Sequence, residues 1–220
     1  MMIAAMMVAA LNVSAQYEPG TFSVQPRVGV SASQFTNMPA ISMSNGGGKL
    51  DSQPTAGFIA GADAEYQLNN WLSLSAGLNL AMQGSGWEDY KDSYGKLKDI
   101  KIETTVLNIP VTANFYVWKG LAVRSGVQFG FLTAAKYKAE YTTSVSGTNT
   151  NTKFDEDCKD DLEKFDISIP VGLSYEFNNH LVIDMRYNIG LTKVNKDSMT
   201  GYKDSKNGVL TLTVGYKIEL

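Results

Sequence analysis

Ten charged residues interrupt stretches that are otherwise built from small polar and apolar side chains. They are Arg27, Asp63, Glu65, Arg124, Asp166, Glu176, Asp184, Arg186, Lys217 and Glu219. A two-residue alternation places all of them on the polar face of their stretch, so in a closed sheet they would share one interior. Buried charges must pair there, because an isolated charge loses its hydration. We predict a salt-bridged interior with Arg124 and Arg186 as central members; the alternative is a narrow solute or ion path gated by the same pairs.

The rest of the chain offers little for catalysis. The single histidine, His180, follows two asparagines in a predicted tight turn and has no serine beside it. Activation of a hydroxyl by a general base requires both groups within hydrogen-bond reach. We therefore expect no enzyme, no catalytic residue, no cofactor and no resident metal.

The single cysteine, Cys158, lies in an acidic run and excludes an intramolecular disulfide. The run, residues 155–161, has the carboxylates that a divalent cation prefers, but it lacks the glycine and the terminal glutamate of an EF-hand loop. A solvated surface is the favoured interpretation. The neighbouring carboxylates are expected to raise the pKa of the Cys158 thiol.

These charges must be positioned by strands, because apolar and polar residues alternate from Thr21 onward. The clearest stretch, Phe165–Phe177, sets seven apolar or aromatic residues against six polar or small ones. Similar stretches cover Phe22–Ser33, Ala56–Leu68, Leu72–Gln83, Leu107–Val117, Val123–Phe131, Leu181–Thr192 and Leu210–Leu220, which makes eight.

The connections between these strands alternate in length. Tight links are predicted at Gln67–Asn70, Trp118–Gly120 and Asn178–His180, and long polar links at 34–54, 84–100, 136–161 and 193–207. This order predicts an all-β fold, an eight-stranded antiparallel up-and-down transmembrane β-barrel with short periplasmic turns and long extracellular loops. Both chain ends would then lie in the periplasm.

The polar faces distinguish a membrane barrel from soluble β folds. Their side chains are small and hydrogen-bonding, as in a packed polar interior, whereas soluble ligand-binding barrels have an apolar interior. The alternative of a soluble β-sandwich conflicts with strands of ten to fourteen residues, since five or six are usual in globular proteins. A barrel closed in lipid gives each apolar stripe an apolar partner and leaves no edge.

The first fifteen residues have the features of a signal peptide. Met1 to Leu11 is almost entirely apolar, and Val13 and Ala15 are the small residues expected before a cleavage site. We predict a signal peptide at 1–15 and a barrel domain at 16–220. No Lys or Arg precedes the apolar run, and the alternative is a buried or anchoring helix.

Aromatic residues gather beside the tight turns. They are Tyr66, Trp71, Phe115, Tyr116, Trp118, Tyr175 and Phe177. Rings clustered at one depth indicate an interfacial girdle. The formal net charge of −3 provides no basic surface, so nucleic-acid binding is not expected.

One hairpin is repeated in the sequence. Residues 107–130 align without gaps to residues 167–190, and both copies carry Ile-Pro-Val. Pro110 and Pro170 lack an N–H and should each break a ladder bond, so a bulge or bend is expected at both. This pattern, followed by RYNIGLTKV at 186–194, resembles the outer-membrane β-barrel proteins of Bacteroidetes, a porin-family or PorT-like group.

The resemblance implies an outer-membrane barrel and carries over no catalytic residue. The last eight residues also resemble the signal read by the barrel-assembly machinery, with Gly215, Ile218 and Leu220 at its key positions; the final residue there is usually aromatic, and Leu220 departs from this.

We expect an integral outer-membrane protein among lipids and lipopolysaccharide, with a structural, adhesive or partner-binding role exerted through its surface loops. The alternative is a narrow-pore porin or an outer-membrane component of a secretion apparatus.

Overall fold

The computed structural model describes residues 17–37, 41–42, 49–91, 95–145, 148–196 and 204–220. The predicted signal peptide, residues 1–15, lies outside the described residues. The elements are β1 (Phe22–Phe35), β2 (Ile41–Ser42), β3 (Lys49–Leu50), β4 (Ser52–Asn69), β5 (Leu72–Trp87), β6 (Tyr90–Lys91), β7 (Gly95–Trp118), β8 (Leu121–Val145), β9 (Thr148–Asp157), η2 (Lys159–Asp161), β10 (Phe165–Glu176), β11 (Leu181–Gly190), β12 (Asn207–Tyr216) and β13 (Ile218–Glu219). No helix among these residues has the length and apolar character to cross a bilayer.

Eight long strands of the described chain form a closed antiparallel ring. The ring order is β1-β4-β5-β7-β8-β10-β11-β12, and β12 returns to β1. Each strand pairs with its predecessor among these eight, so the chain follows an up-and-down meander. Arg27 faces Gly215 where β1 and β12 close the ring, and β13 extends this seam. The all-β, eight-stranded antiparallel up-and-down barrel is confirmed.

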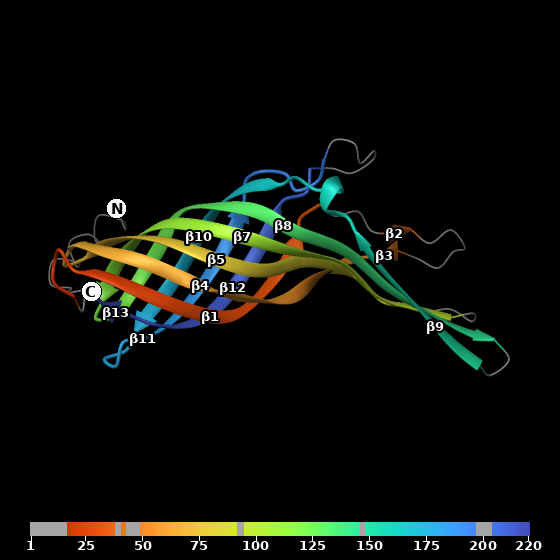
Figure 1. Ribbon diagram of the computed structural model, residues 1–220, viewed down its shortest axis with the longest axis horizontal. Helices are drawn as coiled ribbons and strands as arrows, with labels where there is room; N and C mark the ends of the chain where they lie inside the picture. Colours follow the sequence, from red (N-terminus) through yellow and green to blue (C-terminus); the bar gives the residue numbers. More distant parts are fainter. Residues whose placement is uncertain (1–16, 38–40, 43–48, 92–94, 146–147, 197–203) are drawn as a thin grey trace, which may run out of the picture.

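The two ends of the barrel differ (Figure 1). The tight connections β4–β5, β7–β8 and β10–β11 lie at one end, together with both ends of the described chain. We call this the turn end. The connections β1–β4, β5–β7, β8–β10 and β11–β12 lie at the opposite end, the loop end. The alternation of long and short links therefore agrees with the sequence.

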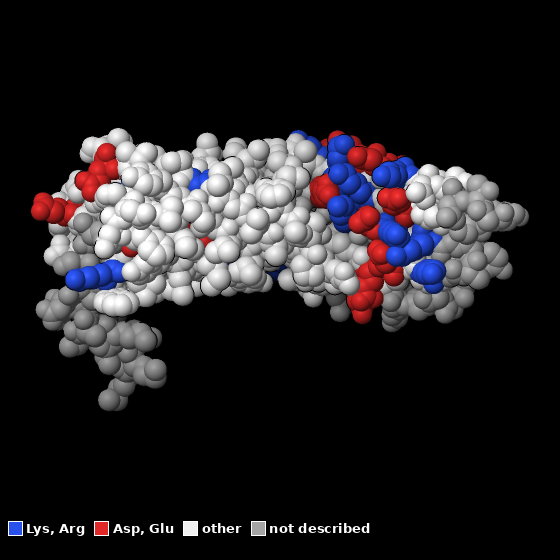
Figure 2. Space-filling view, turned by 90° about the horizontal axis from the view of Figure 1, so that it is seen from below, with Lys and Arg blue, Asp and Glu red and all other residues white. Residues whose placement is uncertain are grey.

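The two faces of the wall follow the predicted alternation. Val28, Phe58 and Trp118 are 63 %, 70 % and 65 % exposed, whereas the inward Asp184 is fully buried. Figure 2 shows the result as a broad outer band almost free of charged side chains, bordered toward the loop end by a belt of Lys, Arg, Asp and Glu. An apolar outer face around a polar interior is the arrangement that a lipid environment favours.

The predicted loops at 84–100 and 136–161 are largely strands in the structure. β7 and β8 contain 24 and 25 residues, and they continue beyond the apolar band. We call this extension the blade: residues 95–105 of β7 and 134–145 of β8, with β6 and β9 on its edges. The sequence prediction was wrong here because strands beyond the lipid need no apolar outer stripe. Ile100 and Ile102 are buried inside the blade instead, so the apolar-outward alternation of the other strands does not continue.

Each of the two prolines interrupts a ladder as predicted, but neither lies in a bulge. The β5–β7 ladder is interrupted near Pro110, and the β8–β10 ladder near Pro170, but the register is the same on both sides of each gap. Register shifts lie elsewhere, between Thr105 and Val106 for example. Each proline removes a hydrogen bond without inserting a residue.

The aromatic girdle is present with one exception. Tyr66, Trp71, Phe115, Trp118, Tyr175 and Phe177 are exposed on the outside near the turn end. The rings of Trp71 and Phe115 stack 6.1 Å apart. Tyr116 points inward instead and is only 4 % exposed, because adjacent residues of a strand face opposite sides of the sheet.

Membrane depth can be tested with nitroxide labels on a Cys158→Ser background. A label at Leu212, on the apolar outer face, should collide with dissolved oxygen more than with a water-soluble nickel chelate, because oxygen partitions into lipid. A label at Lys153, in β9 of the blade, should show the reverse preference. Power-saturation electron paramagnetic resonance in lipid vesicles measures both, and preferential nickel collisions at Leu212 would contradict the lipid-facing assignment.

Candidate functional site

Five charged side chains meet inside the barrel wall. Arg186 pairs through Nη2 with Asp63 Oδ2 at 2.9 Å and through Nε with Asp184 Oδ1 at 2.7 Å. Arg124 Nη1 donates to Asp184 Oδ2 at 2.8 Å. Arg27 Nη2 lies 3.3 Å from Asp63 Oδ1 and its Nη1 lies 3.8 Å from Asp184 Oδ1. Each aspartate therefore contacts all three arginines, and we call these five residues the central network.

Four different strands position the central network. Arg27 lies on β1, Asp63 on β4, Arg124 on β8, and Asp184 and Arg186 on β11. Adjacent strands could not supply all five, so the network exists only when the ring is closed. It therefore connects opposite sides of the barrel.

Inward glycines make room for these side chains. A Cβ added at Gly77 would collide with the Asp63 carboxylate, and one at Gly172 would lie 2.8 Å from Arg186 Cγ. Both glycines face the interior beside a charged residue. The abundance of glycine in these strands therefore serves the packing of the charges.

Neutral side chains satisfy donors that the carboxylates do not reach. Arg124 donates from Nε to Asn114 Oδ1 at 2.7 Å and from Nη2 to Ser75 Oγ at 3.1 Å. Arg27 donates from Nε to Asn79 Oδ1 at 3.1 Å. These residues stand on the polar faces that the sequence indicates, although their specific partners could not be predicted from alternation.

A second group of charges lies nearer the turn end. Lys217 Nζ is 3.2 Å from Glu65 Oε1 and 3.0 Å from Glu176 Oε2. Tyr116 donates its hydroxyl to Glu65 Oε1 at 2.6 Å, and the Lys217 ammonium also lies over the Tyr116 ring. We call Lys217, Glu65, Glu176 and Tyr116 the turn-end cluster. Arg124 Nη2, 3.8 Å from Glu65 Oε2, connects it to the central network.

Tyr17, which precedes the first ring strand, is buried at the turn end and closes it. Its hydroxyl donates to Glu176 Oε1 at 2.5 Å, and His180 Nδ1 lies 2.9 Å away. Gly20 N donates to Gln67 O at 2.8 Å and holds the segment before β1 against the β4–β5 turn. Burial raises the pKa of Tyr17, and the hydrogen bond to Glu176 raises it further. Sequence reasoning missed Tyr17, because it precedes the first alternating stretch.

Two predicted interior charges are separate from both groups. Asp166, at the start of β10, is half-buried and forms no ion pair within the described part of the chain. Glu219 pairs with the inward Ser23 of β1, so it lies on the predicted face, but it is exposed at the rim of the barrel. The structure brings together Arg27, Asp63, Glu65, Arg124, Glu176, Asp184, Arg186 and Lys217.

An apolar cluster covers the loop end of the interior. Phe35, Leu50, Trp87, Ile100, Ile102, Ala135, Ala139 and Leu162 pack there as buried residues. We call it the apolar cap. Cys158 packs against it, and burial, followed by the charges of Asp161 and Asp157, raises the pKa of its thiol. The cap was not predicted from the sequence, because all of its residues lie outside the eight predicted strands, most of them in predicted loops.

The blade carries its own ion pairs. Glu103 binds Lys101 at 2.7 Å and Lys138 at 2.6 Å. Partial burial opposes ionisation of Glu103, but the hydrogen bonds from these lysines prevail and lower its pKa. In the acidic run, Asp155 pairs with Lys136 at 3.0 Å and Asp160 with Lys164 at 3.2 Å. Among the described residues, no group of three or more His, Cys, Asp and Glu side chains is arranged to hold a metal.

Substitution of Asp184 by Asn should destabilise the barrel strongly. Removal of this charge leaves three buried arginines with one fewer carboxylate, and breaking a buried pair typically costs about 3–5 kcal/mol. Asp155→Asn is the control, because its pair with Lys136 is half exposed and should contribute at most about 1 kcal/mol. Reversible urea unfolding in lipid vesicles measures both, and equal losses would contradict a structural central network.

Substitution of Tyr17 by Phe should cost about 1.5–3 kcal/mol, the usual contribution of a buried hydrogen bond to a charged group. Tyr66→Phe, an exposed phenol near the same end, is the control. The pKa of Tyr17 is raised above its ordinary value of 10.0, so its contribution is complete below about pH 10 and declines as the pH rises above it. The stability difference between wild type and Tyr17→Phe should therefore be constant between neutral pH and about pH 10 and shrink above it; a difference that grows above pH 10 would contradict the assignment.

Solved structures with a similar arrangement include three outer-membrane proteins. Ail, the attachment invasion locus protein of Yersinia pestis, is 17 % identical, with a TM-score of 0.44 over 91 % of this chain and 99 % of that one. Neisserial surface protein A is 15 % identical, with a TM-score of 0.41 over 90 % and 97 %. OprG from Pseudomonas aeruginosa is 12 % identical, with a TM-score of 0.41 over 92 % and 97 %. No curated protein matches the chain.

The decisive comparison is with protein families. A family model described as "Outer membrane protein beta-barrel domain" matches residues 14–196, which is most of the chain and includes seven of the eight ring strands. The closed ring, its apolar outer face and its charged interior agree with this match. The chain belongs to the outer membrane protein beta-barrel domain family.

Proposed function

We propose that this protein is a closed outer-membrane anchor that presents the blade to partners outside the cell, in an adhesive or partner-binding role. The observation that carries the proposal is the length of β7 and β8, which have 24 and 25 residues where β11 has 10. About 9–11 residues suffice to cross a bilayer. Roughly a dozen residues of each strand remain, an extension of about 40 Å.

The blade has the surface of a binding element. β9 pairs only with β8 among the described strands, which leaves its other edge open, and its residues from 150 to 157 are exposed. The ion pairs of Glu103, Lys138 and Asp155 hold the blade together near the barrel. An anchored, stiffened strand pair is suited to contact a partner away from the lipopolysaccharide layer.

The charged interior favours an anchor over a narrow pore. The central network and the turn-end cluster contain four cations and four carboxylates, all deeply buried, and their ion pairs cross the barrel. An ion would have to break several of these pairs to pass. The only histidine contacts Tyr17 and Glu176 and has the role of a turn residue, so we propose no catalytic activity.

Biogenesis follows from the same proposal. The chain would be exported with residues 1–15 as its signal peptide and inserted by the barrel-assembly machinery, which would read Gly215, Ile218 and Leu220. Ile218 and Leu220 are exposed on the outside, where a receptor could contact them. The turn end, with both ends of the described chain, would face the periplasm, and the repeated Ile-Pro-Val hairpins support a place in the PorT-like group of Bacteroidetes.

A planar bilayer separates the anchor from the pore. The purified full-length protein should produce no conductance steps, because the paired charges fill the barrel. Insertion is verified by heat-modifiable migration of the same preparation on a detergent gel. Reproducible steps from the inserted protein would instead support the narrow-pore alternative.

Shortening the blade tests its binding role. Lys138 and Asp155 face each other in the β8–β9 ladder, so a two-residue turn can join them directly and keep the register below. Cells producing this variant should attach to surfaces coated with extracellular matrix protein no better than cells without the protein, whereas wild type should attach above that level. The control is Asp155→Asn in the full-length blade, at an equal amount in the outer membrane. Undiminished attachment of the shortened variant would contradict the proposal.

A further inference from the structure

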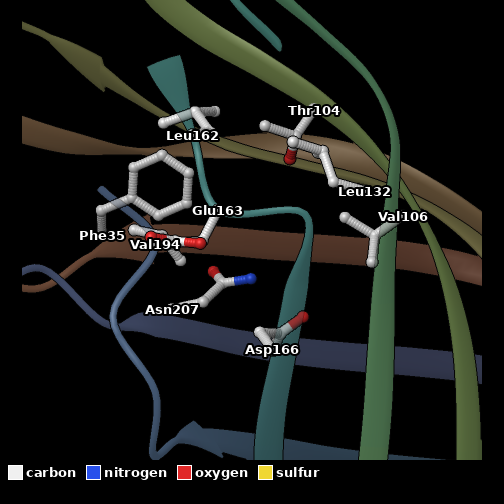
Figure 3. A pocket seen from close by; sticks show the side chains of 9 residues that line it. All are labelled: Phe35, Thr104, Val106, Leu132, Leu162, Glu163, Asp166, Val194 and Asn207. Atoms are coloured by element: carbon white, nitrogen blue, oxygen red, sulfur yellow. The ribbon is translucent and has the colours of Figure 1, made fainter. Parts of the chain in front are cut away.

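A small cavity lies between the polar interior and the apolar cap (Figure 3). Its volume is about 20 Å³, which is room for one water-sized particle. The lining residues are Phe35, Thr104, Val106, Leu132, Leu162, Glu163, Asp166, Val194 and Asn207. Most are apolar, and the four polar side chains, Thr104, Glu163, Asp166 and Asn207, each carry an oxygen atom that can bind a cation.

Two carboxylates on this cavity have no cationic partner. Within the described part of the chain, neither Glu163 nor Asp166 forms an ion pair, although the eight charges deeper in the barrel balance one another. The Asp166 carboxylate lies against Gly130 of β8, where any side chain would collide with it, so it is held inside the wall. The loop end of the interior therefore carries an excess of negative charge.

A third oxygen is buried at the same place and lacks a partner. Asn207 is 9 % exposed. Its Nδ2 donates to Gln83 Oε1 at 2.6 Å, which orients the amide, and its Oδ1 has no hydrogen-bond partner among the described residues. In the view of Figure 3 the amide lies between the side chains of Glu163 and Asp166. A buried oxygen with no hydrogen-bond donor, beside two unpaired carboxylates, provides three oxygens that a cation could contact.

We propose that this cavity binds a divalent cation, Ca²⁺ in preference to Mg²⁺, through the carboxylates of Glu163 and Asp166 and the amide oxygen of Asn207. All three are hard oxygen donors of the kind both ions prefer. Mg²⁺ retains several of its waters in near-octahedral geometry, whereas Ca²⁺ accepts irregular oxygen shells. A cavity with room for one particle leaves little space for retained water, which favours Ca²⁺.

Such an ion would connect parts of the loop end that are distant in sequence. Glu163 follows η2, Asp166 is the second residue of β10, and Asn207 is the first residue of β12. The backbone already joins this region, since Glu163 N donates to Val194 O at 2.9 Å. Bound Ca²⁺ would fix the base of the β8–β10 connection to the barrel. The site is independent of what the blade binds.

Calcium titration of the full-length protein in detergent micelles tests the site. Isothermal titration calorimetry should detect one Ca²⁺ per chain and weaker binding of Mg²⁺. Glu163→Gln and Asp166→Asn should each weaken Ca²⁺ binding by about tenfold or more, since each removes one of two ligand charges. The control is Asp155→Asn in the acidic run, which should bind as wild type does. Absence of Ca²⁺ binding by wild type, or an equal loss in the control, would overturn the proposal.

A stability measurement distinguishes a lost ligand from a misfolded variant. In the presence of a chelator, Asp166→Asn should be at least as stable as wild type, because it removes a buried charge without a partner. Addition of Ca²⁺ should raise the unfolding temperature of wild type and leave that of Asp166→Asn unchanged. A variant that is less stable in chelator, or that Ca²⁺ stabilises as much as wild type, would contradict Asp166 as a ligand.

Discussion

The mutual pairing of four buried cations with four buried carboxylates is the constraint on which the structure depends. A charged side chain enclosed in a membrane barrel loses its hydration, so each one must pair with an opposite charge inside the barrel. Arg27, Arg124 and Arg186 meet Asp63 and Asp184 in the middle, and Lys217 meets Glu65 and Glu176 nearer the turn end. Because several partners, such as Asp63 and Arg186, come from non-adjacent strands, the ring must close in one register for the charges to be satisfied.

That constraint explains the small residues of the inner face. Gly77 and Gly172 lie beside charged side chains that would collide with a Cβ, and Ser75 and Asn114 supply hydrogen bonds to Arg124. The outer face has the opposite requirement and is apolar wherever it meets lipid. Beyond the lipid, neither requirement applies, and the blade combines surface ion pairs with the apolar cap.

The net charge of the interior side chains differs between the two ends of the barrel. The middle and the turn end are neutral, whereas the loop end contains Glu163 and Asp166 without a cation beside the unpaired Asn207 oxygen. A closed interior and the proposed cation site at the loop end are compatible with an anchor that holds its outer part firmly. They are harder to combine with a permeant path, which would need continuous polar space through the central network.

The sequence by itself determined the strands that touch lipid, their number, their inward and outward residues and the order of tight and long links. A strand with lipid on one side and a polar interior on the other must alternate apolar and polar residues, and this alternation is clear in stretches such as Phe165–Phe177. Tertiary structure alone decided which charges pair, because Asp63 and Arg186 are 123 residues apart and nothing in either stretch specifies the other. It also decided the blade and the inward place of Tyr17. Strands beyond the lipid need no apolar outer stripe, and a residue outside the alternation is positioned only by the partner that it contacts.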